Sequence, residues 1–121
     1  MLVLLAALSL MAAAPTPPLQ PWSAAAFSAA QEAGKPLVVF VHASWCITCR
    51  RQEPIVRSLA ADPAFKAVTV FVVDYADKPT LQALKITERS TLVAYRGKAE
   101  RSRSSYVTDP HEIRALFQSA L

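Results

Sequence analysis

Glycine is scarce in this sequence of 121 residues, which contains only Gly34 and Gly97. That scarcity excludes collagen-like and other glycine-rich, low-complexity chains. Cysteine and histidine also occur only twice each. No charged residue precedes Glu32, and no apolar run reaches the roughly 20 residues that cross a membrane comfortably. These absences leave a globular domain as the expected class, with a single pair of cysteines as its most reactive feature.

The composition that is present suits one packed domain, because 53% of the residues are hydrophobic. The formal net charge is +4, and basic residues are spread among acidic ones, with one denser stretch over 96–103. A nucleic-acid-binding protein needs a basic face with interleaved aromatic residues. We therefore expect a mildly basic, solvated surface and no nucleic-acid partner.

The N-terminal segment differs from the rest, because residues 1–14 are apolar apart from Ser9. This length and the small residues at 12–14 are typical of a secretory signal peptide. The segment lacks Lys and Arg, and Pro15 would hinder cleavage just before it, so a retained anchor stays an alternative. We predict a signal peptide or anchor plus a proline-rich linker over 1–21, one domain over 22–121, and a periplasmic or otherwise exported location.

Apolar periodicity and capping residues predict an α/β fold for this domain. Helices are expected over 24–33, 46–60, 78–84 and from 110 onward, and strands over 37–41, 68–73, 91–95 and 100–105. The first strand is apolar throughout and the second is apolar except for Thr69, which is typical of central strands buried on both faces. A right-handed crossover joins them, and a hairpin at Gly97 ends the sheet. We expect a central mixed sheet of about four strands with helices on both faces.

The two cysteines lie three positions apart in Trp45-Cys46-Ile47-Thr48-Cys49, at the start of the second predicted helix. Unpaired N–H groups and the helix dipole favour a thiolate at Cys46. Cys49 lies one turn deeper and is expected to be more buried. We predict a redox pair in which Cys46 is the reachable, attacking thiol and Cys49 resolves the mixed disulfide.

The residues around the pair suggest a groove for a partner. Trp45 and Ile47 are expected to flank the site, and Thr48 to place a hydroxyl near the sulfurs. Ile47 is also a candidate for the inward face of the helix, together with Ile55, Val56 and Leu59.

Two other roles for the cysteines remain open. A structural disulfide is one, although so short a loop removes little entropy from the unfolded chain. Half of a zinc site is the other, although His42 and His111 are the only histidines and one chain cannot easily complete four ligands.

With these elements in place, the chain resembles the thioredoxin family from about Trp22 to Leu121. The resemblance is most specific over residues 40–54, where Pro54 matches the proline that kinks the family's active-site helix. Trp-Cys-Ile-Thr-Cys-Arg, with Glu53 shortly after, is similar to the C-terminal periplasmic domain of transmembrane thiol:disulfide interchange reductases.

The resemblance implies a thioredoxin fold in which Cys46 and Cys49 are the redox-active pair. It implies no cofactor and no metal site, protein thiols and disulfides as partners, and a membrane-embedded electron donor. We expect the protein to act as a monomer.

The most informative departure from the family is at Ser90, which stands where the family has a cis-proline facing the disulfide. A cis bond before a non-proline residue costs about 2.5–4 kcal/mol, so we predict a trans or strained peptide there. Ser90 is expected to bring a hydroxyl near the sulfurs and to make metal capture by the thiols easier. Arg89 is expected to bring positive charge toward Cys46 and to line the groove with Ser90.

Two further departures concern proton transfer and the groove. Phe40 stands where many thioredoxins bury an aspartate, which is expected to keep the Cys49 thiol protonated. His42 either compensates for that aspartate or is simply a packed residue. Tyr106 and Val107 stand where the family often has a glycine, so the groove is expected to be narrower.

The sequence therefore predicts an exported thiol–disulfide oxidoreductase that reduces protein disulfides, although it does not set the direction of electron flow. The alternative is a thioredoxin-like module that binds a metal or a partner without general thioredoxin activity.

Overall fold

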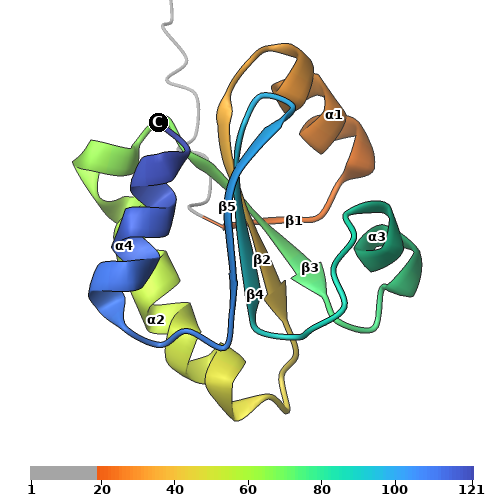
Figure 1. Cartoon of the computed structure of the whole chain (residues 1–121), viewed down its shortest axis with the longest axis vertical. Helices are drawn as coiled ribbons and strands as arrows, with labels where there is room; N and C mark the ends of the chain where they lie inside the picture. The colour runs from red at the N-terminus through yellow and green to blue at the C-terminus, as the bar shows by residue number, and fades with distance from the viewer. Residues whose placement is uncertain (1–18) are drawn as a thin grey trace, which may run out of the picture.

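The computed structural model describes residues 19–121, which form an α/β sandwich (Figure 1). Its elements are β1 (Leu19–Pro21), α1 (Ala24–Glu32), β2 (Pro36–His42), α2 (Ile47–Ala61), the 3-10 turn η1 (Pro63–Phe65), β3 (Thr69–Asp74), α3 (Lys78–Ala83), β4 (Thr91–Arg96), β5 (Ala99–Ser105) and α4 (Pro110–Ser119). In Figure 1, α2 and α4 lie on one face of the sheet, and α1 and α3 lie on the other. The predicted order of elements and the helices on both faces are confirmed.

The sheet is mixed and has five strands in the order β1-β3-β2-β4-β5, one more than expected. β1, β3 and β2 are parallel, whereas β4 runs antiparallel to β2 and β5 antiparallel to β4. The additional strand is β1, in which Leu19 pairs with Val70 and Pro21 with Val72. The sequence predicts a linker here, because a segment of three residues that contains proline shows no strand pattern. Proline is tolerated in β1 because β1 is an edge strand.

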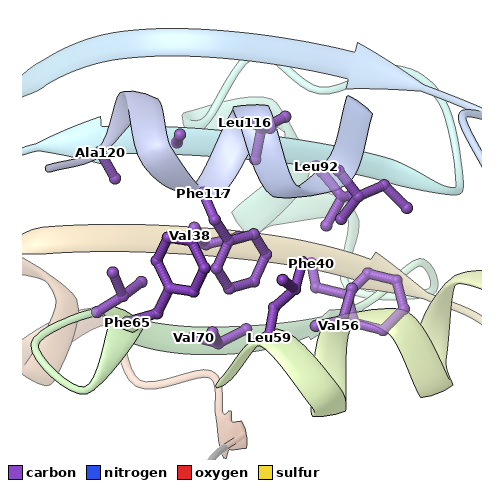
Figure 2. Packing of buried hydrophobic residues seen from close by; sticks show 13 residues of the cluster. Val38, Phe40, Val56, Leu59, Phe65, Val70, Leu92, Leu116, Phe117 and Ala120 are labelled. Carbon is purple, nitrogen blue, oxygen red and sulfur yellow. The ribbon is translucent and has the colours of Figure 1, made fainter. Parts of the chain in front are cut away.

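Alternation along β2 divides the interior into two cores. Val38 and Phe40 face α2 and α4, while Leu37, Val39 and Val41 face α1 and α3. Figure 2 shows the first core, where Phe65 and Phe117 pack edge to face with ring centroids 5.6 Å apart. A strand buried on both faces is fixed rigidly, so the loop that follows β2 presents the cysteines from a firm support.

The two glycines of the chain meet at one end of the sheet. Gly34 and Gly97 have φ values of +69° and +57°, which glycine adopts at little cost. The Gly97 N–H donates to the Lys35 carbonyl oxygen over 2.8 Å. A Cβ atom at Gly97 would lie 3.1 Å from the Gly34 Cα. The two glycines therefore allow the backbones of these turns to approach each other closely.

The predicted signal peptide or anchor lies outside the described residues. Within residues 19–121, no helix combines the length and the apolar character needed to cross a bilayer.

Candidate active site

Cys46 caps the N-terminus of α2. Its Sγ accepts a hydrogen bond of 3.2 Å from the backbone N–H of Cys49, one of the donors that a helix start leaves without a partner. The Cys46 N–H donates to the carbonyl oxygen of Ala43, which tightens the loop after β2. The site predicted for Cys46 is therefore formed by the strand–loop–helix sequence itself, and both cysteines are free thiols.

The Ser90 hydroxyl lies between the two sulfurs. Its Oγ is 3.1 Å from the Sγ of Cys46 and 3.0 Å from the Sγ of Cys49, and Ser90 is fully buried. The residues 19–121 contain no cis peptide bond, and Ser90 has a φ of +58°. The first of the two predicted alternatives, a trans peptide, is therefore the one observed, and the left-handed φ of a non-glycine residue is a separate source of strain.

Gln52 is a site residue that the sequence reasoning missed. Its fully buried side chain on α2 donates through Nε2 to the carbonyl oxygens of Ser90, over 3.1 Å, and Val107, over 2.8 Å. Its Oε1 has no hydrogen-bond partner among the described residues. Turning the amide around would place Oε1 against two carbonyl oxygens, so the observed orientation is the favourable one. A signal was present, because Gln52 lies on the stripe formed by Cys49, Val56 and Leu59.

Several hydrogen bonds hold the segment that carries Ser90. The backbone N–H of Tyr106 donates to the Ser90 carbonyl oxygen over 3.0 Å. The Thr91 hydroxyl donates to the carbonyl oxygen of Glu88 over 2.7 Å, and the Tyr106 hydroxyl donates to the Glu88 carboxylate over 2.7 Å. These bonds fix the backbone of Ser90, so its hydroxyl is positioned by the fold.

Arg89 lies over two aromatic rings beside the site. Its guanidinium carbon is 5.3 Å from the Trp45 ring centroid and 5.5 Å from that of Tyr106. Both distances are within the range of a cation–π contact. Arg89 therefore bridges the CxxC loop and the segment after β5, and its charge lies near Cys46, as predicted.

The environment of Cys46 lowers its pKa to about 7 from an ordinary 9.0. Burial opposes ionisation, but hydrogen bonds from the Cys49 side chain, the Ser90 hydroxyl and the Cys49 N–H outweigh it, and the Arg89 guanidinium adds to them. The thiolate form of Cys46 is therefore accessible near neutral pH.

The pKa of Cys49 is shifted in the opposite direction. Burial raises the pKa of its thiol, and the neighbouring Cys46 sulfur raises it further, while the Ser90 hydroxyl opposes both. The unequal pair matches the predicted division into an attacking thiolate and a resolving thiol.

One expectation about Cys46 is wrong. The residue is only 2% exposed, where the sequence predicted a thiol reachable from solvent. The reason is that its Sγ turns inward, toward the Cys49 N–H and the Ser90 hydroxyl. The neighbours Trp45 and Ile47 are instead 64% and 67% exposed, so a partner meets these side chains before it meets the sulfur.

The remaining groove residues occupy different positions. Ile47 is on the outer side of α2 and is not an inward residue, whereas Val56 and Leu59 are buried as expected. Thr48 is half-buried, and within the described chain its hydroxyl makes no hydrogen bond to either sulfur. The hydroxyl expected from Thr48 is supplied by Ser90 alone.

His42 is packed at the end of β2 and does not hydrogen-bond Cys49. Its Nε2 lies 3.4 Å from the Glu53 carboxylate without the alignment of a hydrogen bond, and its ring meets the edge of Phe40. Phe40 belongs to the core between the sheet and α2. The position of the family's buried aspartate is therefore apolar here, and His42 is turned toward Glu53.

Residues 19–121 contain no cluster of three or more His, Cys, Asp or Glu side chains that could hold a metal ion. The two thiols supply two soft ligands, so a metal bound there would need further ligands from a second chain.

Comparisons with known proteins agree with this fold. A family model described as thioredoxin-like matches residues 18–106. The crystal structure of Trxlp from Edwardsiella tarda is 39% identical, with a TM-score of 0.77 over 81% of this chain and 97% of that chain. A search of curated proteins found no match.

Two thioredoxin structures of lower identity show the same fold. The Malassezia sympodialis thioredoxin is 21% identical, with a TM-score of 0.75 over 90% of this chain and 98% of that chain. Thioredoxin O2 from Arabidopsis thaliana is 20% identical, with a TM-score of 0.73 over 84% of this chain and 93% of that chain. From the family model and the Edwardsiella structure together, this chain belongs to the thioredoxin-like family.

Proposed function

We propose that the protein is a thiol–disulfide oxidoreductase that works through Cys46 and Cys49. The observation that carries the proposal is the hydrogen bonding of the Cys46 sulfur, which receives the Cys49 N–H and contacts the Ser90 hydroxyl at the start of α2. These contacts, with Arg89 nearby, lower the pKa of Cys46 to about 7, so that its thiolate is available near neutral pH.

The reaction proceeds by two exchanges at sulfur. The Cys46 thiolate attacks a disulfide, forms a mixed disulfide and expels one thiolate of the partner. Cys49 then attacks the Cys46 sulfur, closes the Cys46–Cys49 disulfide and releases the second partner thiol. Two electrons pass from the protein to the partner, and a donor dithiol must return them.

The pKa of Cys46 favours the reducing direction. Reducing thioredoxins have a nucleophilic cysteine with a pKa of about 7, whereas the strongly oxidising members reach about 3.5 because their thiolate form is much more stable. The value of about 7 for Cys46 is on the reducing side. We propose protein disulfides as substrates and a membrane-embedded dithiol as the electron donor.

The proposed location is outside the cytoplasm. It is supported by the apolar residues 1–14 and by the similarity of the WCITC motif to periplasmic reductase domains. Expression of the full chain with a reporter active only after export tests this location. A reporter that stays inactive, while a version carrying an established signal peptide is active, would argue against it.

The activity is tested by insulin reduction with dithiothreitol as electron donor. Cys46→Ser is expected to abolish reduction, because the attacking sulfur is lost. Cys49→Ser is expected to trap a mixed disulfide that mass spectrometry detects. Wild-type activity in the Cys46→Ser variant would contradict the proposal. Potentials measured against glutathione test the direction, and a value more positive than that of glutathione would contradict the reducing role.

A further inference from the structure

The Ser90 hydroxyl has one proton and two sulfur neighbours at almost equal distance, 3.1 Å to Cys46 and 3.0 Å to Cys49. It can donate to only one of them at a time, although its oxygen can accept from the other. In the reduced protein the thiolate is at Cys46, so the Ser90 hydroxyl donates there, as the Cys49 thiol does. Both sulfurs of the reduced protein therefore have a hydrogen-bond partner.

The second exchange changes which sulfur needs a donor. Once Cys46 is part of a mixed disulfide, its sulfur is neutral and Cys49 must become the thiolate. The carbonyl oxygen of Val41, 3.8 Å from the Cys49 sulfur, is an acceptor and cannot stabilise an anion. Phe40 is apolar, and His42 is turned toward Glu53. The backbone of Ala43 offers Cys49 one hydrogen bond that lowers its pKa, and Ser90 is the side-chain hydroxyl in contact with Cys49 among the described residues.

We propose that Ser90 is a catalytic residue that donates a hydrogen bond first to the Cys46 thiolate and then, by rotation of its hydroxyl, to the Cys49 thiolate. The proposal rests on the thiol–disulfide exchange proposed above and assigns a step within it. Rotation about the Cβ–Oγ bond is enough, because Gln52 and the Tyr106 N–H hold the Ser90 carbonyl in place. We call this movement of the donor the Ser90 transfer.

Protons and electrons balance along this route. Cys46–S⁻ attacks a disulfide R–S–S–R′, so that the bond from Cys46 to the sulfur of R forms and R′–S⁻ leaves. The Cys49 proton passes to solvent water, and the Ser90 hydroxyl turns to the new thiolate. Cys49–S⁻ attacks the Cys46 sulfur, the internal disulfide forms and R–S⁻ leaves. The substrate disulfide is reduced by two electrons and the protein dithiol is oxidised by two.

Rapid mixing of the reduced protein with an aromatic disulfide that releases a coloured thiolate separates the two steps. The first release reports attack by Cys46, and its rate rises with reagent concentration. The second reports attack by Cys49, and its rate does not. Ser90→Ala is expected to slow both releases at neutral pH by about ten-fold or more, because a hydrogen bond to an anion is lost in each.

The matched control is Ser102→Ala. Ser102 is a half-buried serine whose hydroxyl lies 2.6 Å from that of Ser119, within the β5–α4 part of the fold. Its loss is expected to leave both releases unchanged. Ser90→Gly guards against a folding defect of the alanine variant, because glycine accepts the positive φ of this position more easily and also lacks the hydroxyl.

The outcomes separate the two proposals. Slowing of both releases in Ser90→Ala and Ser90→Gly supports the Ser90 transfer. A second release at the wild-type rate in either folded variant overturns it, while the exchange function stands. A wild-type protein that releases no thiolate at all overturns the exchange function, and the Ser90 transfer with it.

Discussion

The amide nitrogen of Gln52 lies 3.1 Å from the carbonyl oxygen of Ser90, so a buried side chain of the active-site helix holds the segment that presents the serine hydroxyl to the sulfurs. The same amide reaches Val107 on the segment after β5. Gln52 thereby joins α2 to two parts of the chain that are remote in sequence. It acts on the cysteines only through Ser90, which makes it a positioning residue.

Gln52→Leu is expected to lower the free energy of unfolding by about 1–3 kcal/mol, because two carbonyl oxygens lose a buried donor. It is also expected to move the pH midpoint of Cys46 alkylation, because the Ser90 hydroxyl is no longer held between the sulfurs. Chemical denaturation and the alkylation rate against pH measure the two effects. Gln118→Leu on the exposed side of α4 is the control, expected within about 0.5 kcal/mol of wild type. An unchanged midpoint in Gln52→Leu would show that its role is structural only.

The helices and strands were predictable from the sequence, but the hydrogen bonds from Gln52 to Ser90 and Val107 were not. The strands at 37–41, 68–73 and 91–95 follow from short runs that are apolar except for Thr69 and Thr91. The start of α4 follows from Asp109, which accepts from the N–H groups of His111 and Glu112. A glutamine on a helix usually indicates a solvated face. The helical spacing of Gln52 with Cys49, Val56 and Leu59 indicates the inward face, but its two partners depend on how α2 meets the segments around residues 90 and 107, which no local pattern contains.

In the active site, too, the features set by the local sequence were predictable, and those set by contacts between distant segments were not. The N-cap position of Cys46 was predictable, because it arises from the helix that follows. The direction of its pKa shift was expected for the same reason, although the Cys49 side chain and the Ser90 hydroxyl lower that pKa more than the helix N–H does. The 2% exposure of Cys46 and the contact of Ser90 with both sulfurs were not predictable. They depend on the left-handed φ of Ser90, which brings its side chain onto the sulfurs from the start of a different strand.

Replacement of Arg89 tests its electrostatic contribution. Arg89→Ala is expected to raise the pKa of Cys46 above its value of about 7, because the guanidinium beside the thiolate is removed. The alkylation rate against pH should show the midpoint at higher pH. It should also show a faster limiting rate at high pH, because a side chain next to a covered sulfur is gone. Arg101→Ala, an exposed arginine in β5, is the charge-matched control. A midpoint equal in both variants would contradict this role.

The reduced protein is expected to gain stability as the pH rises from about 7 to about 9. The pKa of Cys46 is lowered on folding, from 9.0 to about 7, so its contribution is complete above the unfolded value and is lost as the pH falls through the folded one. The pKa of Cys49 is raised, so above about pH 9 its contribution declines as the pH rises.

Urea denaturation of reduced wild type and Cys46→Ser across this range measures the effect. The difference in unfolding free energy between the two should grow with pH up to about 9. A constant difference would mean that folding does not stabilise the Cys46 thiolate.

The two glycines allow a matched test of backbone packing. Both have a positive φ, so alanine at either position is expected to cost about 1–2 kcal/mol. Gly34→Ala adds nothing further, since its Cβ would meet no atom within 4 Å. Gly97→Ala should cost more, because its Cβ would lie 3.1 Å from the Gly34 Cα and 3.2 Å from the Gln31 carbonyl oxygen. Thermal unfolding of the two variants compares them, and equal melting temperatures would contradict the close approach.

The placement of the two tryptophans has a practical consequence for spectroscopy. Trp22 packs against Phe27 and Phe71, with ring centroids 4.8 and 5.9 Å away, while Trp45 is 64% exposed next to Cys46. Emission from Trp22 should shift when the tertiary structure melts, and emission from Trp45 should change when the neighbouring disulfide opens or closes. A single unlabelled sample, with Trp45→Phe to assign the signals, thus carries separate optical reporters of folding and of oxidation state.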